Sequence, residues 1–225
     1  MKNIGCRIVK EFNRPSKDVV DLFKSLPVPN IDDCMGRLGA VAPEIRPMNK
    51  APLLGTAFTV KVPAGDNLMF HKAMDMAQPG DVIVIDADGY TERAILGEIM
   101  LSYCKSRKLA GVIVDGSIRD ADALEQMDIP VYARGITPDG PYKNGPGEIN
   151  TTVTFGGKVV KPGDIIVGDA DGIVIIDPDD AKDLAEKARK ITDKEVGIMK
   201  NIVENGKYER PWVDEVLKDL QVEYI

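Results

Sequence analysis

Two short stretches of the sequence carry charged groups whose types suit chemistry on a small anion. GEIM at 97–100 contains Glu98, and IRD at 118–120 contains Arg119 and Asp120. A carboxylate such as Asp120 can hold a divalent cation, and Glu98 can approach the same cation directly or through water. Arg119 adds a permanent positive charge and several donors beside that cation. The sequence therefore predicts a site with Glu98 and Arg119 as catalytic groups and Asp120 as the metal ligand.

The helix that we expect to begin near Gly97 supplies a second binding feature. N–H groups in the first turn of a helix lack partners within the helix and attract a carboxylate. We expect Gly97 and the amides of Ile99 and Met100 to take the carboxylate of a 2-oxo acid. Its keto oxygen would meet the metal and Arg119, which stabilise a developing enolate. The simpler alternative is an exposed Arg119–Asp120 pair, which contributes little to stability.

The neighbouring elements explain how these residues can meet. The Val- and Ile-rich runs at 82–86 and 111–115 predict buried strands, and the helix that starts near Gly97 lies between them. A crossover helix that joins two parallel neighbours brings its own start and the end of the second strand to the same side of the sheet. We therefore expect Glu98 and the pair at 119–120 to share one pocket.

The rest of the chain predicts many strands and few intervening helices. Expected strands are 54–62, 79–86, 111–116, 129–135, a hairpin at 151–160 with its turn at Gly156-Gly157, and a strand pair at 162–177. Expected helices are 15–26, a short one capped by Asn30 and ended by Gly36 or Gly39, 68–77, 93–108, 120–127 and 179–205. This order favours an α/β fold with a mixed sheet over a doubly wound one. We expect one core over residues 1–178, with a helix and tail at 179–225 that can pack on a neighbouring subunit.

Composition narrows the class of protein. The 225 residues have a formal net charge of −7 and no basic stripe, which argues against a nucleic-acid partner. No apolar run has transmembrane length and no export signal is recognisable, so we expect no membrane partner. Three separated cysteines without a CxxC motif fit a reducing, cytoplasmic setting. Neither GxGxxG nor a P-loop pattern occurs, which argues against nucleotide cofactors and methyl donors.

Several motifs together resemble one known family. They are Glu98 followed by twenty residues and Arg119-Asp120, GTAFTV at 55–60, GDN at 65–67 and VDGSIRD at 114–120. The family contains the class II 4-hydroxy-4-methyl-2-oxoglutarate/4-carboxy-4-hydroxy-2-oxoadipate aldolases and the RraA-type regulators of ribonuclease activity, and the resemblance covers roughly residues 28–180. It implies a β/β/α swivelling-domain fold, assembled as homotrimers or dimers of trimers with active sites at subunit junctions.

The resemblance also implies an activity. Its aldolases need Mg²⁺ or Mn²⁺, release pyruvate from a branched 4-hydroxy-2-oxo diacid, and decarboxylate oxaloacetate as a side activity. By position, Asp120 is implied to bind the metal, and Arg119 to contact pyruvate and its enolate. The amides of Ile99 and Met100 are implied to take the pyruvate carboxylate. Glu98 replaces a family Asp that orders metal-bound water, which puts substrate choice and rate in doubt more than metal binding.

Some interpretations stay open. The resemblance places the GDN loop near the site, so we expect Asn67 to contribute to substrate binding. His71, the only histidine, is either an acid or base or a structural residue. The loop 137–149, rich in Gly and Pro, either borders the substrate or connects strands at a subunit contact. The rival function is that of a protein-binding regulator without catalysis. Regulators of this family generally lack the full acidic set, so Glu98 together with Asp120 favours an aldolase.

Overall fold

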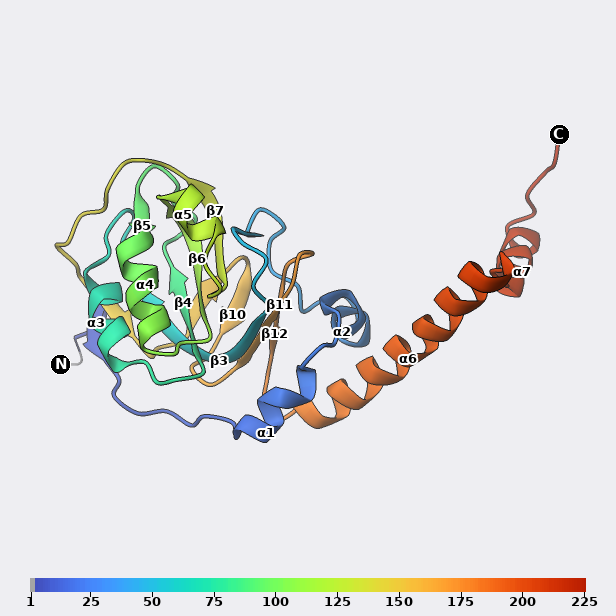
Figure 1. Cartoon of the computed structure of the whole chain (residues 1–225), viewed down its shortest axis with the longest axis horizontal. Helices are drawn as coiled ribbons and strands as arrows, with labels where there is room; N and C mark the ends of the chain where they lie inside the picture. Colours follow the sequence, from blue (N-terminus) through green and yellow to red (C-terminus); the bar gives the residue numbers. More distant parts are fainter. Residues whose placement is uncertain (1–2) are drawn as a thin grey trace. The chain divides into compact units, whose positions relative to one another are not determined.

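The structure, a computed structural model, describes residues 3–225, and its centre is a sheet whose middle strands run parallel (Figure 1). These strands, in spatial order, are β3 (Leu53–Lys61), β4 (Asp81–Asp86), β6 (Gly111–Ile118) and β7 (Val131–Ile136). β4 pairs in parallel with β6, with Ile85 opposite Val114, so the predicted neighbours are confirmed. Because these strands point the same way, their C-terminal ends gather at one edge of the sheet.

Shorter strands extend this sheet and make it mixed, as predicted. They are β1 (Cys6–Ile8), β2 (Arg46–Pro47), β5 (Ala94–Leu96), β8 (Gly147–Ile149), β11 (Ile165–Gly168) and β12 (Ile173–Ile176). A separate antiparallel hairpin consists of β9 (Val153–Phe155) and β10 (Lys158–Val160). β11 pairs antiparallel with the first half of β3, and β8 pairs antiparallel with its last residues. The long β3 therefore joins both parts of the sheet.

Side chains on the two faces of the sheet enter two different apolar clusters. The helices of the chain are α1 (Lys17–Val20), η1 (Asp21–Phe23), α2 (Val28–Cys34), α3 (Leu68–Met76), α4 (Glu98–Ser106), α5 (Ala121–Glu125), α6 (Ala181–Asn205) and α7 (Pro211–Asp219). Along β4, alternate residues point to opposite faces. Ile83 packs in a cluster with Phe70 of α3 and Leu101 of α4. Val84 packs with Phe155 of β9. Both faces are thus covered, which explains why the middle strands are apolar throughout.

A third cluster closes the side formed by β11 and β12. Ile165 and Val174 from these strands pack with Phe23 of η1, Ile31 of α2 and Ala185 of α6, and all five side chains are buried. The first turns of α6 therefore belong to the core of the sheet-containing part of the chain.

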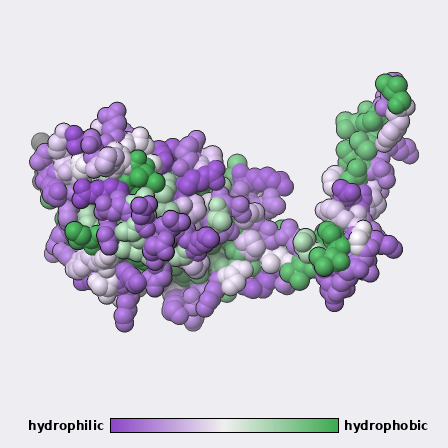
Figure 2. Space-filling view, turned by 45° about the horizontal axis from the view of Figure 1, so that its top comes forward, coloured by the Kyte–Doolittle hydropathy of each residue, from purple (hydrophilic) through white to green (hydrophobic). Residues whose placement is uncertain are grey.

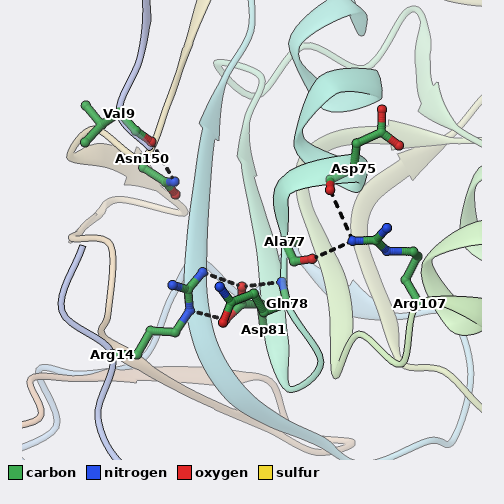
Figure 3. A network of polar contacts seen from close by, with 8 residues as sticks. All are labelled: Val9, Arg14, Asp75, Ala77, Gln78, Asp81, Arg107 and Asn150. Carbon is green, nitrogen blue, oxygen red and sulfur yellow. Dashed lines mark hydrogen bonds and ion pairs between the residues drawn. The ribbon is translucent and has the colours of Figure 1, made fainter. Parts of the chain in front are cut away.

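An extended N-terminal segment is tied to the sheet by side-chain bonds (Figure 3). The Nε and Nη2 atoms of Arg14 donate to the two carboxylate oxygens of Asp81 at 3.0 and 2.8 Å. The Gln78 N–H donates to the same carboxylate at 2.8 Å, and Asn150 Nδ2 donates to the Val9 carbonyl at 3.0 Å. Asp81 begins β4, so the bonds of Arg14 and Gln78 to Asp81 lie at the N-terminal ends of the parallel strands, whereas Asn150 follows β8, which pairs with the last residues of β3.

Residues 189–225 form a second compact unit, separate from the unit that ends at Ala188. This division lies within α6, whereas the sequence suggested a boundary just before that helix. Large apolar side chains of the second unit stay exposed, among them Val203 at 77%, Trp212 at 60% and Leu220 at 69% (Figure 2). A surface of this kind is typical of protein contacts. Within residues 3–225, no helix is both long and apolar enough to cross a membrane.

Two expected helix limits near the N-terminus were wrong. The single helix expected at 15–26 is α1 followed by the 3₁₀ turn η1, and Ser25 then takes a positive φ of 63°, which no helix continues through. Asn30 does not cap the next helix. Pro27 holds that position, and Asn30 is buried inside α2.

Two other elements differ from expectation further along the chain. The helix expected at 93–108 is in fact β5 followed by α4, because Ala94, Ile95 and Leu96 are fully buried and β5 pairs with the end of β6. The C-terminal tail contains α7, which starts at Pro211, a favoured residue at the first helical position. The long helix expected at 179–205 is confirmed as α6.

Candidate functional site

The backbone turns sharply where β6 ends, and this turn aims Asp120 at the start of α4. Asp120 has φ 59° and ψ 39°, a left-handed conformation. Asp and Asn adopt it more readily than other residues with a side chain, although it remains strained by about 1–3 kcal/mol. Asp120 Oδ2 accepts a hydrogen bond of 2.9 Å from the Glu98 N–H. The carboxylate therefore lies on the first free amide of α4, where the helix dipole favours negative charge.

Gly97 makes this close approach possible. A Cβ atom at position 97 would overlap Asp120 Oδ2 and lie 3.0 Å from Arg119 Cγ. The φ of Gly97 is −147°, which any residue can adopt, so the requirement is for space rather than for backbone freedom. Glycine at this position is therefore part of the geometry of the site.

Arg119 and Asp120 lie side by side without a tight ion pair. Arg119 Nε is 3.8 Å from Asp120 Oδ2, and the two side chains are 46% and 43% exposed. This separation exceeds hydrogen-bond distance, and a half-exposed pair of this kind contributes little to stability. Both groups consequently remain available to a ligand.

A cavity of about 180 Å³ lies beside the pair and is large enough for a small oxo acid. Its lining residues are Asn67, His71, Ile95, Leu96, Gly97, Ile99, Met100, Arg119, Asp120, Pro141 and Lys143. The structure thus brings together Asn67, Gly97, Ile99, Met100, Arg119 and Asp120, the predicted site residues other than Glu98. Their elements meet at the C-terminal edge of the parallel strands, the usual ligand-binding edge of such sheets.

Glu98 contributes its backbone rather than its side chain. Its N–H binds Asp120, while its side chain is exposed and does not line the cavity. The Glu98 N–H already donates to Asp120. A ligand carboxylate at the start of α4 could therefore accept hydrogen bonds only from the N–H groups of Ile99 and Met100. Ile99 is 83% exposed, so its apolar side chain forms part of an open rim.

Lys143 is a cavity residue that the sequence reasoning missed. It lies in the loop before β8, and this loop borders the cavity, one of the two roles considered for residues 137–149. The available signal was a lone cation between Tyr142 and Asn144 in a Gly- and Pro-rich stretch. With Arg119 it gives the cavity two cations against the one carboxylate of Asp120. The site therefore suits an anion.

Two polar atoms of the cavity wall lack partners within residues 3–225. Asn67 is 1% exposed, and its Nδ2 donates to the Ile95 carbonyl at 2.9 Å, yet its Oδ1 is unpaired. His71 Nε2 is also buried and unpaired. Burial and then the nearby Lys143 lower the pKa of His71, while Asp75 opposes them. The ring is therefore neutral near pH 7 and can accept or donate a hydrogen bond.

The donor set suits a hard divalent cation that keeps most of its water. Asp120 has one carboxylate oxygen outside the bond to the Glu98 amide, and carboxylate oxygens are preferred ligands of Mg²⁺ and Mn²⁺. No group of three His, Cys, Asp or Glu side chains that could enclose a metal occurs in the part of the chain that the structure describes. A cation here would be held mainly by Asp120, as in Mg²⁺ sites with few protein ligands.

Comparison with known proteins gives the family. The RraA-like family model, described as Aldolase/RraA, matches residues 17–175, and the chain belongs to this family. A Halalkalibacterium halodurans protein named "Putative 4-hydroxy-4-methyl-2-oxoglutarate aldolase" is 41% identical over 174 residues, which cover 77% of this chain and 83% of that protein. The mixed α/β architecture agrees with the fold expected for RraA-like proteins.

Two solved structures with the same fold carry other functional names. One, from Geobacillus kaustophilus and described as an S-adenosylmethionine:2-dimethylmenaquinone methyltransferase, is 31% identical with a TM-score of 0.62 and covers 67% of this chain and 94% of that one. The other, the RNA-processing inhibitor RraA from Thermus thermophilis, is 26% identical with a TM-score of 0.61 and covers 67% and 92%. Because one fold carries three functional names, the site rather than the fold must assign the activity.

Proposed function

We propose that this protein is a divalent-metal-dependent lyase that releases pyruvate from a 4-hydroxy-2-oxo diacid such as 4-hydroxy-4-methyl-2-oxoglutarate. The observation that carries the proposal is the placement of Asp120 against the start of α4, beside Arg119 and a cavity of small-acid size. The aldolase name of the Halalkalibacterium halodurans relative supports the same class of reaction.

The chain offers separate groups for the parts of such a substrate. The open amides at the start of α4 and the cation of Arg119 would bind the 2-oxo acid end. Lys143, which also lines the cavity, would attract the second carboxylate. Asp120 would hold Mg²⁺ or Mn²⁺, and when bound that ion would supply Lewis-acid polarisation of a keto oxygen. The Glu98 side chain is exposed and does not line the cavity, so the water-ordering role that the family resemblance implies for it stays a prediction.

These positions would suit the proposed reaction. The 4-hydroxyl group loses its proton to water, the bond between C3 and C4 breaks, and C4 leaves as the carbonyl carbon of the second product. The electron pair of the broken bond moves toward the keto group and gives the enolate of pyruvate, which then takes a proton at C3. Arg119 faces the cavity with a permanent charge, so it would stabilise the enolate oxygen more strongly than the neutral ketone. Decarboxylation of oxaloacetate passes through the same enolate, and we propose it as a side activity.

A second candidate is a protein-binding regulator without catalysis. The similarity to the Thermus RNA-processing inhibitor favours it, as do the exposed apolar side chains of residues 189–225. We propose instead that this second unit packs on neighbouring copies in a homotrimer or a dimer of trimers. A cytoplasmic location is part of the same proposal.

Coupling pyruvate release to lactate dehydrogenase tests the proposed function. The purified protein would receive 4-hydroxy-4-methyl-2-oxoglutarate or oxaloacetate, each with Mg²⁺ and again with EDTA. Pyruvate from the aldol that depends on Mg²⁺ supports the aldolase, and pyruvate from oxaloacetate alone supports a decarboxylase. If the folded protein releases none from either substrate, the lyase proposal fails and the regulator takes precedence.

A further inference from the structure

Asp66 is a buried carboxylate that bonds to two chain segments, each next to a residue that lines the cavity. Its side chain is 3% exposed. Asp66 Oδ1 accepts the Leu68 N–H at 2.8 Å, at the start of α3. Asp66 Oδ2 accepts the N–H groups of Asn144 and Gly145 at 2.6 and 3.0 Å. Within residues 3–225 no cation forms an ion pair with Asp66, so backbone amides alone satisfy this charge, and each such bond is charge-assisted.

Each of the two segments joined by Asp66 contributes a polar residue to the cavity lining. Asn67, the next residue, immediately precedes α3 and lines the cavity. Lys143, also a lining residue, immediately precedes the Asn144 amide that Asp66 binds. A helix cap alone would explain the bond to Leu68 but not the two bonds to a loop about eighty residues away in sequence.

The backbone around Asp66 and a neighbouring arginine support the same loop. The Tyr142 N–H donates to the Gly65 carbonyl at 2.8 Å, and the Asn67 N–H donates to the Tyr142 carbonyl at 3.0 Å. Arg93 Nη1 donates to the Gly140 carbonyl at 2.9 Å, and its guanidinium lies 4.3 Å from the centre of the Tyr142 ring. The backbone on the N-terminal side of Lys143 is therefore bonded to residues 65–67 and to Arg93, although the Lys143 side chain itself is exposed.

The loop also approaches the catalytic arginine. A Cβ atom at Gly140 would lie 3.3 Å from Arg119 Nη1, so the loop backbone runs beside this guanidinium. Any shift of residues 140–146 would change both the position of Lys143 and the space available to Arg119. The placement of the loop therefore determines the distance between the two cations of the site.

We propose that Asp66 is a positioning residue that fastens the Lys143 loop to the start of α3 and so sets the spacing between Lys143 and Arg119. This spacing would select substrates with two carboxylates over those with one. The inference rests on the proposed function for its effect on substrate, while the fastening itself is a property of the fold.

The test uses the full-length Asp66→Asn protein, whose amide presents an NH₂ group to one set of N–H donors. Hydrogen–deuterium exchange of the peptide spanning 139–148 should rise about tenfold or more, since local opening becomes easier. KM for the diacid should rise about tenfold while kcat changes by less than about threefold, because binding geometry is lost and Arg119 remains. The dissociation constant of pyruvate alone should change less than this KM.

The matched control is Asp164→Asn. Asp164 is also buried, 6% exposed, and its Oδ2 accepts the Lys161 N–H at 2.8 Å, next to the start of β11. This substitution should leave exchange at 139–148 and KM unchanged. Arg93→Gln releases the other side of the loop and should change exchange and KM in the same direction as Asp66→Asn. If Asp66→Asn does not fold, Arg93→Gln therefore still tests whether loosening of the loop raises KM.

Two results would overturn the inference. One is unchanged exchange at 139–148 in folded Asp66→Asn, and the other is faster exchange without any change in KM or in ligand affinity. If the wild-type protein releases no pyruvate but binds it, the proposed lyase fails separately. Exchange at 139–148 and the dissociation constant of oxaloacetate, a diacid, then still decide whether Asp66 positions the loop.

Discussion

Two of the Arg–Asp pairs in the described residues lie at opposite ends of the parallel strands, and they differ in geometry and in burial. Arg14 donates two hydrogen bonds, of 3.0 and 2.8 Å, to the Asp81 carboxylate, and the Asp81 side chain is 2% exposed. Arg119 lies 3.8 Å from Asp120, and both side chains are about half exposed. The same two residue types thus form a tight, buried ion pair in one place and a loose, half-exposed one in the other. Geometry and burial, rather than composition, separate the structural pair from the pair that we propose to bind a ligand.

The largest expected effect is on activity, from Asp120→Ala. Removing the carboxylate that would hold the metal should lower the rate of pyruvate release by about 10³-fold or more. The free energy of unfolding should fall by only about 1 kcal/mol, the usual effect of a lost helix cap, because the half-exposed Asp120 carboxylate gives up its bond to the Glu98 N–H. Steady-state kinetics and thermal melting of the same preparation check this. If Asp120→Ala kept full activity, Asp120 would not be the metal ligand of the active site.

The opposite pattern is expected for Asp81→Asn. Breaking a buried ion pair on one side destabilises a protein by about 3 kcal/mol or more, because the remaining charge is left without its partner. The midpoint of urea unfolding should fall accordingly, while kcat of the folded protein stays near the wild-type value. A loss of kcat at full stability would show that the two pairs are not functionally distinct.

Arg119→Lys should lower kcat by about 10²-fold with little change in stability. Lysine keeps the charge but lacks the planar fork of donors that arginine presents to an oxyanion. The measurement is kcat and KM at saturating Mg²⁺, beside a melting curve. An unchanged kcat would mean that Arg119 does not contact the reacting oxygen.

Gly97→Ala should impair the site through crowding. Its Cβ would overlap Asp120 Oδ2, so Asp120 must move off the Glu98 amide, which should destabilise the fold by about 1–3 kcal/mol and reduce activity. Gly197 in α6 is the control, because a Cβ there meets nothing within 4 Å. Gly197→Ala should therefore leave activity unchanged. Equal activities in the two variants would contradict the proposed crowding.

The smallest expected effect concerns His71 and pH. Burial, followed by Lys143, lowers the pKa of His71 in the folded protein, so below about pH 6.5 the unfolded chain binds more protons than the folded one. The contribution of His71 to stability therefore falls as pH falls from about 6.5 toward the lowered pKa. The drop in melting temperature between pH 7 and pH 5.5 should be smaller in His71→Gln. An equal drop in both proteins would show that His71 does not titrate this way.

The parts of the site that follow directly from local sequence could be predicted. The apolar runs of β4 and β6, with a helix between them, predict parallel neighbours, and this places Arg119 and Asp120 near the start of α4. Lys143 could not be predicted, since its position depends on bonds between Asp66 and a distant loop. The direction of the Glu98 side chain also could not be predicted. Its amide faces the site, while its side chain projects from the first turn of α4 into solvent.

The predictions of secondary structure were wrong where a short apolar segment suits a strand and a helix equally well. The residues of Ala94–Leu96 are common both in strands and in buried helices. This segment forms a strand because it pairs with β6. The mixed sheet, by contrast, followed from the number of strands and the scarcity of helices between them. Long-range pairing is thus the information that a local reading of the sequence lacks.

The most direct test of the contrast between the two pairs is Mn²⁺ binding, followed by electron paramagnetic resonance, in the wild-type protein, Asp120→Asn and Asp81→Asn. The wild-type protein and folded Asp81→Asn should both bind Mn²⁺, and pyruvate should alter the spectrum of the bound ion. Asp120→Asn should lose this binding while keeping its fold. Equal Mn²⁺ affinity in all three proteins would contradict the assignment of Asp120 as the metal ligand and, with it, the proposed lyase site.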